Sequence, residues 1–231
     1  MGKRQNHNKN TILGIDIGST QFRVAICDIM PNNEIVLKSV GMSPSNGLLK
    51  GCIVHAEKFE AALDLAIQSA TAKADIRPSY AITNFPLYHY KHTQNTGIIT
   101  IEHTPKTITE MDKQHALQKA HHIIKHPKQK IIHAVPYNYK VDHKYTHSPV
   151  GKTGSYLEAN IHFILGDVRN IRLLKRSLNK LGLYIRGIVY EGSSLGYMLL
   201  SEQERQQGAI IMDMGGEYTK AHIFQNNHLV N

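Results

Sequence analysis

Thr11-Ile-Leu-Gly-Ile-Asp-Ile-Gly-Ser-Thr20 is the stretch that decides the fold of this chain. It begins as an apolar run and ends in a tight acidic-glycine turn. The next residues, Gln21 to Ile29, alternate between apolar and polar side chains, with Phe22, Val24 and Ile26 on one face. An apolar run before a glycine turn and an alternating run after it predict a strand, a tight turn and a return strand.

The same design returns near the other end of the sequence. An apolar strand is expected over residues 208–212, an acidic-glycine turn at Asp213-Met-Gly-Gly216, and a return strand over residues 219–224. One Asp-x-Gly turn is weak evidence, because Asp and Gly are favoured in hairpins for turn geometry alone. Two such turns, each after a buried strand and a domain's length apart, point to a shared purpose.

Phosphate binding suits this pair of turns. A glycine-rich turn points backbone N–H groups at an anion, because no side chain stands in the way. Hydroxyl groups add donors, and an aspartate can hold the water shell of a phosphate-bound Mg²⁺. The candidate nucleotide-binding residues are therefore Asp16, Gly18, Ser19, Thr20, Asp213, Gly215 and Gly216, with Asp16 and Asp213 serving a metal through water. No residue is a candidate for a catalytic role.

Around the first turn the pattern predicts a mixed α/β layer. Residues 11–84 are expected to run β-β-β-(β)-α-β, with a helix over about 57–73 whose apolar residues recur at helical spacing. A second helix is expected from the cap Asp167 to Gly182, a glycine where a helix commonly ends. Residues 191–200 predict a small-residue helix, and 201–207 a polar crossing.

The residue pattern changes at residue 85, and residues 85–165 predict an inserted α+β subdomain. Its expected parts are a strand at 97–101, a helix to about 124 with a capping box at Thr109 and Asp112, strands at 130–135 and 137–141, and a strand at 157–165. The expected organisation is a disordered tail at 1–10, a first subdomain at 11–84 and 166–207, the insert at 85–165, and the start of a second lobe at 208–231.

Composition limits the setting. The formal charge is +9, but the basic residues are spread along the chain, which favours a solvated surface over a nucleic-acid partner. Two cysteines are too few for a disulfide framework and are typical of a cytosolic protein. No stretch is long enough to span a bilayer, so membrane contact is expected to be peripheral or through a partner. The 15 histidines show no metal-ligand spacing and are expected mostly at the surface.

The segments together resemble one family. Residues 11–26 look like the first phosphate motif of the actin, Hsp70 and hexokinase superfamily, and residues 208–224 like the second. Within it, four further segments resemble segments of the FtsA family of bacterial cell-division proteins, in the same order. They are Leu49-Lys-Gly-Cys-Ile-Val54, Ile132-His-Ala-Val-Pro-Tyr-Asn-Tyr-Lys-Val-Asp142, Ser148-Pro-Val-Gly-Lys-Thr-Gly-Ser-Tyr-Leu-Glu158 and Val189 to Leu200. The two segments of the inserted subdomain are the specific part.

This resemblance implies an actin-like (ribonuclease H-like) α/β fold with an FtsA-type insert. It implies ATP and Mg²⁺ as cofactors, FtsZ and other divisome proteins as partners, and self-association through the insert. FtsA-like proteins bind FtsZ through the second lobe and reach the cytoplasmic face of the membrane, at the division site, by a C-terminal amphipathic helix. Here the resemblance extends only to the start of the second lobe, so we expect that lobe to be truncated and its first strand to be an unpaired sheet edge.

The second turn departs from the family pattern, which is roughly Asp-x-Gly-Gly-Gly-Thr-x-Asp. Glu217 brings negative charge to the phosphate side, Tyr218 replaces a small hydroxyl residue, and Lys220 replaces the second aspartate. One like-charge pair at ~4 Å costs on the order of 4 kcal/mol at an effective dielectric near 20. A one-residue slip would instead place Thr219 at the hydroxyl position. We expect weak or absent ATP binding.

Three interpretations remain open from the sequence. The first is an FtsA-like interaction protein, with Ser148–Glu158 and Phe85–Tyr90 as contact surfaces or as plain loop and core. The second is an ATP-dependent kinase or chaperone-type ATPase of the same superfamily, which would need a general base and an adenosine site. The third is the product of a decaying gene, against which stands the intact strand and helix patterning up to Met212.

Overall fold

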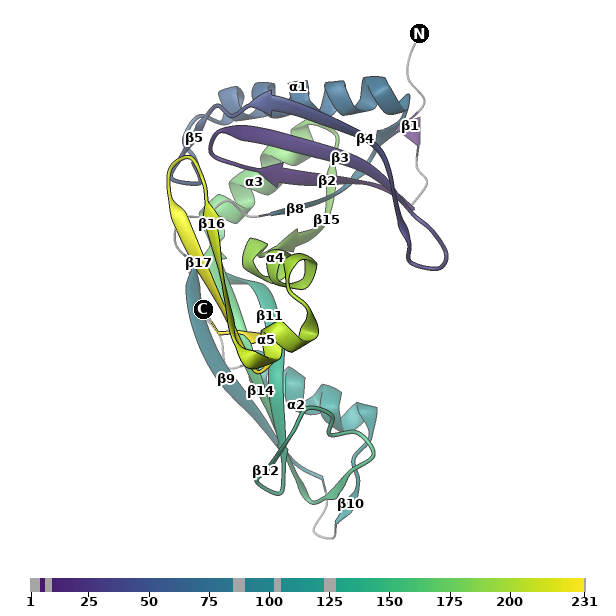
Figure 1. Cartoon of the computed structure of the whole chain (residues 1–231), viewed down its shortest axis with the longest axis vertical. Coiled ribbons are helices and arrows are strands. Elements are labelled where there is room, and N and C mark those ends of the chain that lie inside the picture. The colour runs from purple at the N-terminus through teal and green to yellow at the C-terminus, as the bar shows by residue number, and fades with distance from the viewer. Residues whose placement is uncertain (1–4, 7–9, 85–89, 102–104, 123–127, 231) are drawn as a thin grey trace. The chain divides into compact units, whose positions relative to one another are not determined.

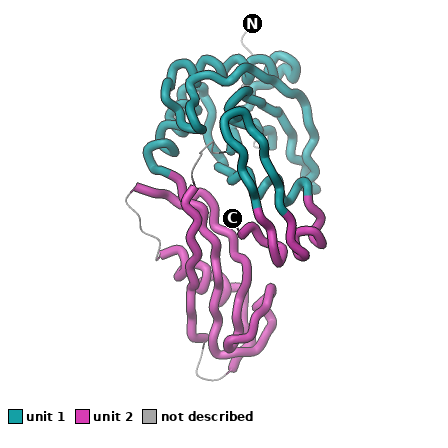
Figure 2. The backbone as a smooth tube through the Cα atoms, turned by 60° about the vertical axis from the view of Figure 1, so that its left-hand side comes forward, with its two compact units in different colours: residues 1–89, 167–199, 210–222 teal, residues 90–166, 200–209, 223–231 magenta. Residues whose placement is uncertain are grey.

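The computed structural model describes residues 5–6, 10–84, 90–101, 105–122 and 128–230 (Figure 1). The chain divides into two compact units (Figure 2). Unit 1 is made of residues 1–89, 167–199 and 210–222, and unit 2 of residues 90–166, 200–209 and 223–231. The chain therefore enters unit 2 three times, at residues 90, 200 and 223, and the second acidic-glycine turn lies in unit 1.

Unit 1 is built on a five-stranded mixed sheet with the order β15-β8-β2-β3-β4. Its strands are β2 (Thr11–Ile17), β3 (Gln21–Ile29), β4 (Ile35–Pro44), β8 (Tyr80–Asn84) and β15 (Tyr184–Val189). β2, β3 and β4 are antiparallel neighbours, whereas β8 lies parallel to both β2 and β15. The predicted strand–turn–strand over residues 11–29 is confirmed, and it forms the centre of this sheet.

Helices α1 (Ala56–Ala74) and α3 (Val168–Lys180) pack on each other, α1 on β3 and β4, and α3 on β15 (Figure 1). Phe22, Val24 and Ile26 are fully buried, and the Phe22 ring meets Phe59 of α1 edge-on at 5.3 Å. Close packing requires Gly41 in β4, because a Cβ there would lie 2.1 Å from the Ala66 carbonyl oxygen. The alternation of β3 thus places its apolar residues under α1.

The ends of α3 follow the prediction. Asp167 caps the helix by accepting hydrogen bonds from the backbone N–H groups of Arg169 and Asn170, at 2.8 and 3.3 Å. Gly182 takes a positive φ of 76° just beyond the last turn, where a glycine is favoured. The basic side chains of α3 are exposed and its leucine stripe is buried, as predicted for a solvated face.

Short elements complete unit 1. Two-residue strands pair as β5 (Leu48–Leu49) with β6 (Cys52–Ile53), and as β1 (Gln5–Asn6) with β7 (Arg77–Pro78). β1 lies inside the segment 1–10 that we predicted to be a disordered tail, so two of its residues form a strand. Helix α4 (Glu191–Leu199) is the predicted small-residue helix, and Gly192, Ser193 and Gly196 are its buried residues.

Unit 2 holds a four-stranded sheet with the order β12-β11-β14-β9. Its strands are β9 (Lys91–Thr100), β11 (Gln129–Val141), β12 (Lys144–Thr146) and β14 (Tyr156–Asp167). α2 (Glu110–His122) packs on β9, where a Cβ at Gly97 would lie 1.8 Å from the Ala116 carbonyl oxygen. The predicted pair at Thr109 and Asp112 caps α2, with the Thr109 hydroxyl donating to Asp112 at 2.6 Å. The short strands β10 (Lys106–Thr107) and β13 (Thr153–Gly154) pair beside it.

One prediction within unit 2 is wrong. We expected two strands separated at Pro136, but β11 runs unbroken through this residue. The proline is tolerated because β12 pairs only with Tyr139–Val141, so at Pro136 the described part of the sheet has one neighbour rather than two.

The last part of the chain forms α5 (Glu202–Gln207) and a three-stranded sheet of β16 (Ala209–Met214), β17 (Thr219–Gln225) and β18 (His228–Leu229). We predicted a polar crossing instead of α5. The missed signal was Ser201-x-x-Glu204, which forms a complete capping box. Within the described residues β16 is an edge strand, as predicted. The prediction that it is buried is wrong: it exposes Ile210, Met212 and Met214, because the described residues give it a strand neighbour on one side only. None of the helices in the described residues is long and apolar enough to cross a bilayer.

Candidate functional site

The carboxylate of Asp16, at the end of β2, is held by two side chains. Arg23 of β3 donates to Asp16 Oδ2 at 2.9 Å, and the Asn84 amide of β8 donates to Asp16 Oδ1 at 3.0 Å. The Asn84 amide oxygen also accepts from the Ile17 backbone N–H at 2.8 Å, which fixes the amide in place. Both oxygens that would face metal-bound water are therefore engaged by protein donors.

The two glycine turns touch each other inside unit 1. A Cβ on Gly216 would lie 2.2 Å from Thr20 Cγ2 and 3.9 Å from Ser19 Cβ. The second turn is closed by a hydrogen bond from the Gly215 N–H to the Tyr218 carbonyl oxygen at 3.0 Å. The fold thus brings Ser19, Thr20 and Gly216 together, turn against turn.

Asp213 belongs to a different group of ligating atoms. One oxygen or nitrogen each from Glu191, Asp213 and His222 lie within 4.8 Å of one another, contributed by α4, β16 and β17. Asp16 is not in this group. The sequence reasoning missed Glu191 and His222, and it expected the histidines mostly at the surface, whereas His222 is fully buried. The strand pattern held a usable signal, since His222 shares a face with Lys220 at the strand period of two.

Lys220 lies within this group of side chains. Its ammonium forms an ion pair with the Glu191 carboxylate, and the two side chains are only 11% and 16% exposed. Burial lowers the pKa of Lys220 from 10.5 to about 8, which still leaves most molecules charged at neutral pH. The Nζ atom also sits 4.8 Å from the centre of the Tyr218 ring, a cation–π contact.

The first turn of helix α4 packs against the side chains of this group. Gly192 allows His222 to approach, because a Cβ at that position would lie 2.4 Å from the imidazole Nδ1. The Tyr190 hydroxyl lies 3.3 Å from the same nitrogen, and burial raises the Tyr190 pKa to about 12. The imidazole is therefore fixed in orientation by its surroundings.

These residues do not fit a magnesium-bound triphosphate. The backbone of Gly216 in one turn packs on the side chain of Thr20 in the other, and Asp16 is engaged by Arg23 and Asn84. A lysine ammonium contacts Glu191, where a divalent cation would meet like charge. Tyr218 is partly buried beside Ser19, whose side chain forms a hydrogen bond with it.

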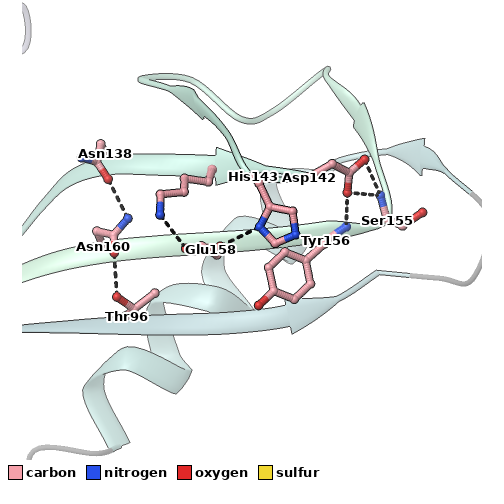
Figure 3. A network of polar contacts seen from close by, with 9 residues as sticks. Thr96, Asn138, Asp142, His143, Ser155, Tyr156, Glu158 and Asn160 are labelled. Atoms are coloured by element: carbon pink, nitrogen blue, oxygen red, sulfur yellow. Dashed lines mark hydrogen bonds and ion pairs between the residues drawn. The ribbon is translucent and has the colours of Figure 1, made fainter.

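Unit 2 carries a polar ladder on its sheet, shown in Figure 3. Asn160 of β14 accepts from the Thr96 hydroxyl at 2.6 Å and donates to the Asn138 amide oxygen at 2.6 Å. Further along the strand, Glu158 pairs with Lys140 at 3.3 Å and with His143 at 3.6 Å. Alternate residues of β14, such as Leu157 and Ala159, belong to the apolar core beneath α2. The ladder is therefore the polar face of a two-faced sheet.

The loop before β14 is anchored by Asp142. Its carboxylate accepts from the backbone N–H groups of Ser155 and Tyr156 at 3.1 and 2.9 Å (Figure 3). Most of residues 148–153 are exposed, while Leu157 and Glu158 are buried. The expected contact surface Ser148–Glu158 thus divides into an exposed loop and a buried strand. Most of the other expected surface, at residues 85–89, lies outside the described residues.

A pair of histidines adds a buried feature to the same sheet. His92 Nδ1 lies 2.8 Å from His162 Nε2, and the two rings meet edge-on. Burial, and then the neighbouring His92, lowers the pKa of His162 from 6.5 to about 4. This side chain is therefore neutral at physiological pH.

Comparison with solved structures defines the class of fold. The chain aligns with the PilM-PilN type IV pilus biogenesis complex at a TM-score of 0.61 and 14% identity, over 95% of this chain and 60% of the other. That identity supports the fold alone. Residues 88–165 match the model of the SHS2 domain inserted in FTSA. The protein thus has an actin-like fold carrying an SHS2 insert.

Curated relatives identify the particular member of this class that the chain resembles. FtsA of Borreliella burgdorferi is 26% identical over 213 residues, covering 90% of this chain, and FtsA of Pseudomonas aeruginosa is 25% identical over 214 residues, covering 92%. The chain resembles the N-terminal portion of the cell-division protein FtsA. It spans about half the length of these relatives, 51% of each.

Proposed function

We propose that this protein acts in bacterial cell division as an FtsA-like interaction protein. It works by protein–protein contact at the cytoplasmic face of the membrane, where it helps to link the FtsZ ring to that membrane and recruits other divisome proteins. The observation that carries the proposal is the SHS2 match over residues 88–165, set inside an actin-like unit and accompanied by FtsA relatives along about 90% of the chain.

The SHS2 insert is the proposed contact element, including for self-association. Its exposed loop at residues 148–153 includes Val150, which is 39% exposed. Asp142 holds the far end of this loop through Ser155 and Tyr156, so the loop has a defined shape on which a partner can dock without first ordering it. Membrane contact is peripheral or runs through a partner.

We propose further that the nucleotide site is degenerate and that the protein is not an enzyme. The packing of Gly216 on Thr20 and the ion pair of Lys220 with Glu191 support this. The alternative, an ATP-dependent kinase or chaperone-type ATPase, needs the triphosphate site that these contacts obstruct. Calorimetric titration with Mg-ATP separates the two, because millimolar ATP should give no binding heat, whereas micromolar binding would favour the ATPase.

The division function is tested with the full chain in two ways. A fluorescent fusion should collect at the septum of dividing cells, and the purified chain should capture divisome proteins, FtsZ among them. Val150→Glu should weaken capture because it places a charge on the proposed loop. Met111→Glu is the matched control, since Met111 is 68% exposed on α2 in the same unit. A fusion spread evenly through the cell, with no capture by the purified chain, would refute the proposal.

A further inference from the structure

The group formed by Glu191, Asp213 and His222 is arranged like a metal site, yet it already holds a positive charge. Two carboxylates and an imidazole present ligating atoms within 4.8 Å of one another. Oxygen and imidazole donors at that spacing suit Zn²⁺, Co²⁺ or Mn²⁺. The ammonium of Lys220 lies against Glu191 in the same group.

The fold places this lysine in the group by the alternation of β17. Thr219 and Ala221 are exposed, whereas Lys220 and His222 point to the buried side. A lysine directed inward from a strand is rarely buried without a counter-charge, and here the side chain is 11% exposed beside Glu191. The lysine and the carboxylate therefore meet where the first turn of α4 contacts Lys220 and His222 of β17.

We propose that Lys220 is a built-in cation: its ammonium takes the position of a divalent ion among Glu191, Asp213 and His222, and its removal opens a transition-metal site there. This deepens the proposed function and rests on it, because it names the group that would make the site independent of metal and nucleotide. His222 has contacts that do not involve the lysine, since the Tyr190 hydroxyl lies 3.3 Å from its Nδ1 and the backbone of Gly192 packs against its ring.

Charge balance gives the physical reason. Two carboxylates this close repel each other, and a cation between them relieves that repulsion. The ammonium of a lysine supplies one positive charge and cannot dissociate from the chain. A divalent metal ion supplies two charges, but its occupancy depends on its concentration. A metal ion entering beside Lys220 would meet a like charge at contact distance, so the native chain should exclude it.

The test is a titration of the full chain with Co²⁺, in which binding is measured by calorimetry and by visible absorption. The native protein should show only the weak binding of its surface histidines. Lys220→Ala should gain one site that binds Co²⁺ at least tenfold more tightly, with a ligand-field absorption band. Adding Asp213→Asn to that variant should remove the site. Lys180→Ala is the matched control, because it breaks the ion pair of Lys180 with Glu60 on α1 and leaves the group intact.

Each outcome decides the proposal. A Lys220→Ala chain that titrates like the native protein overturns it, as does a native chain whose tight Co²⁺ binding is lost with Asp213→Asn. If Lys220→Ala does not fold, Lys220→Met is titrated, because methionine fills a similar volume. If neither variant folds, refolding by millimolar Co²⁺ supports the built-in cation and failure to refold refutes it. A native fusion absent from the septum counts against the division function alone, since the Co²⁺ titration does not depend on it.

Discussion

Gly41 should be among the least replaceable residues of unit 1. Gly41→Ala adds one methyl group to β4 directly beneath α1. That Cβ would lie 2.1 Å from the Ala66 carbonyl oxygen, 2.4 Å from the Ala70 backbone nitrogen and 3.0 Å from the Ala70 Cβ. Two of these three atoms belong to the helix backbone, so no side-chain rotation relieves the clash.

The magnitude follows from how the helix is held. α1 is anchored by Phe59, Leu63 and Ile67, all fully buried, so it must shift as a body to make room. Adding a methyl group to a close-packed core costs typically about 1–3 kcal/mol, and the backbone contact places Gly41→Ala near ~3 kcal/mol. For a chain of this size, such a loss lowers Tm by roughly 6–12 °C.

The assay is urea unfolding followed by far-UV circular dichroism. Gly187→Ala is the matched control, because Gly187 lies in β15 of the same sheet and a Cβ there meets nothing within 4 Å. It should change the free energy of unfolding by less than about 0.5 kcal/mol. If Gly41→Ala lies within that range of Gly187→Ala, the close-packing explanation for Gly41 is wrong.

Three further predictions concern single side chains. Lowering the pH from 6.5 towards 4 should reduce the free energy of unfolding by up to about 3 kcal/mol. The reason is that the unfolded chain binds a proton at His162, whereas the folded chain, in which the His162 pKa is about 4, does not. In His162→Gln the urea midpoint should therefore depend less on pH across this range. Asp167→Ala should lower the free energy of unfolding by about 1 kcal/mol, since α3 loses the side-chain cap on two N–H groups. Asp167→Asn should retain most of the native stability in thermal melts, because asparagine can also cap. Asn160→Ala should cost about 1–3 kcal/mol because Thr96 and Asn138 lose their buried partner, a result that would be contradicted by a melting temperature equal to that of the native chain.

Local pattern was sufficient for the elements themselves. The alternation of residues 21–29, the helical spacing of 57–73 and the cap at Asp167 depend on neighbours a few positions apart, so the sequence carried them directly. The boundary of the inserted segment, placed at residue 85 from the change in composition there, stays a prediction; the SHS2 match begins at residue 88. The capping box at Ser201 was equally local, and α5 could have been predicted from it.

The contents of the candidate site were decided by tertiary structure. The sequence singled out Asp16, Asp213 and both glycine turns, but no spacing rule showed that Asp16 would be held by Arg23 and Asn84. Nor did it show that Asp213 would gather with Glu191 and His222, because these residues come from three elements whose packing alone sets their distances. Short-range periodicity depends on neighbouring residues, so it can be recognised in the sequence. Contacts between elements that are far apart in the chain depend on how helices and sheets pack. For Lys220, that packing determined which charged group it contacts.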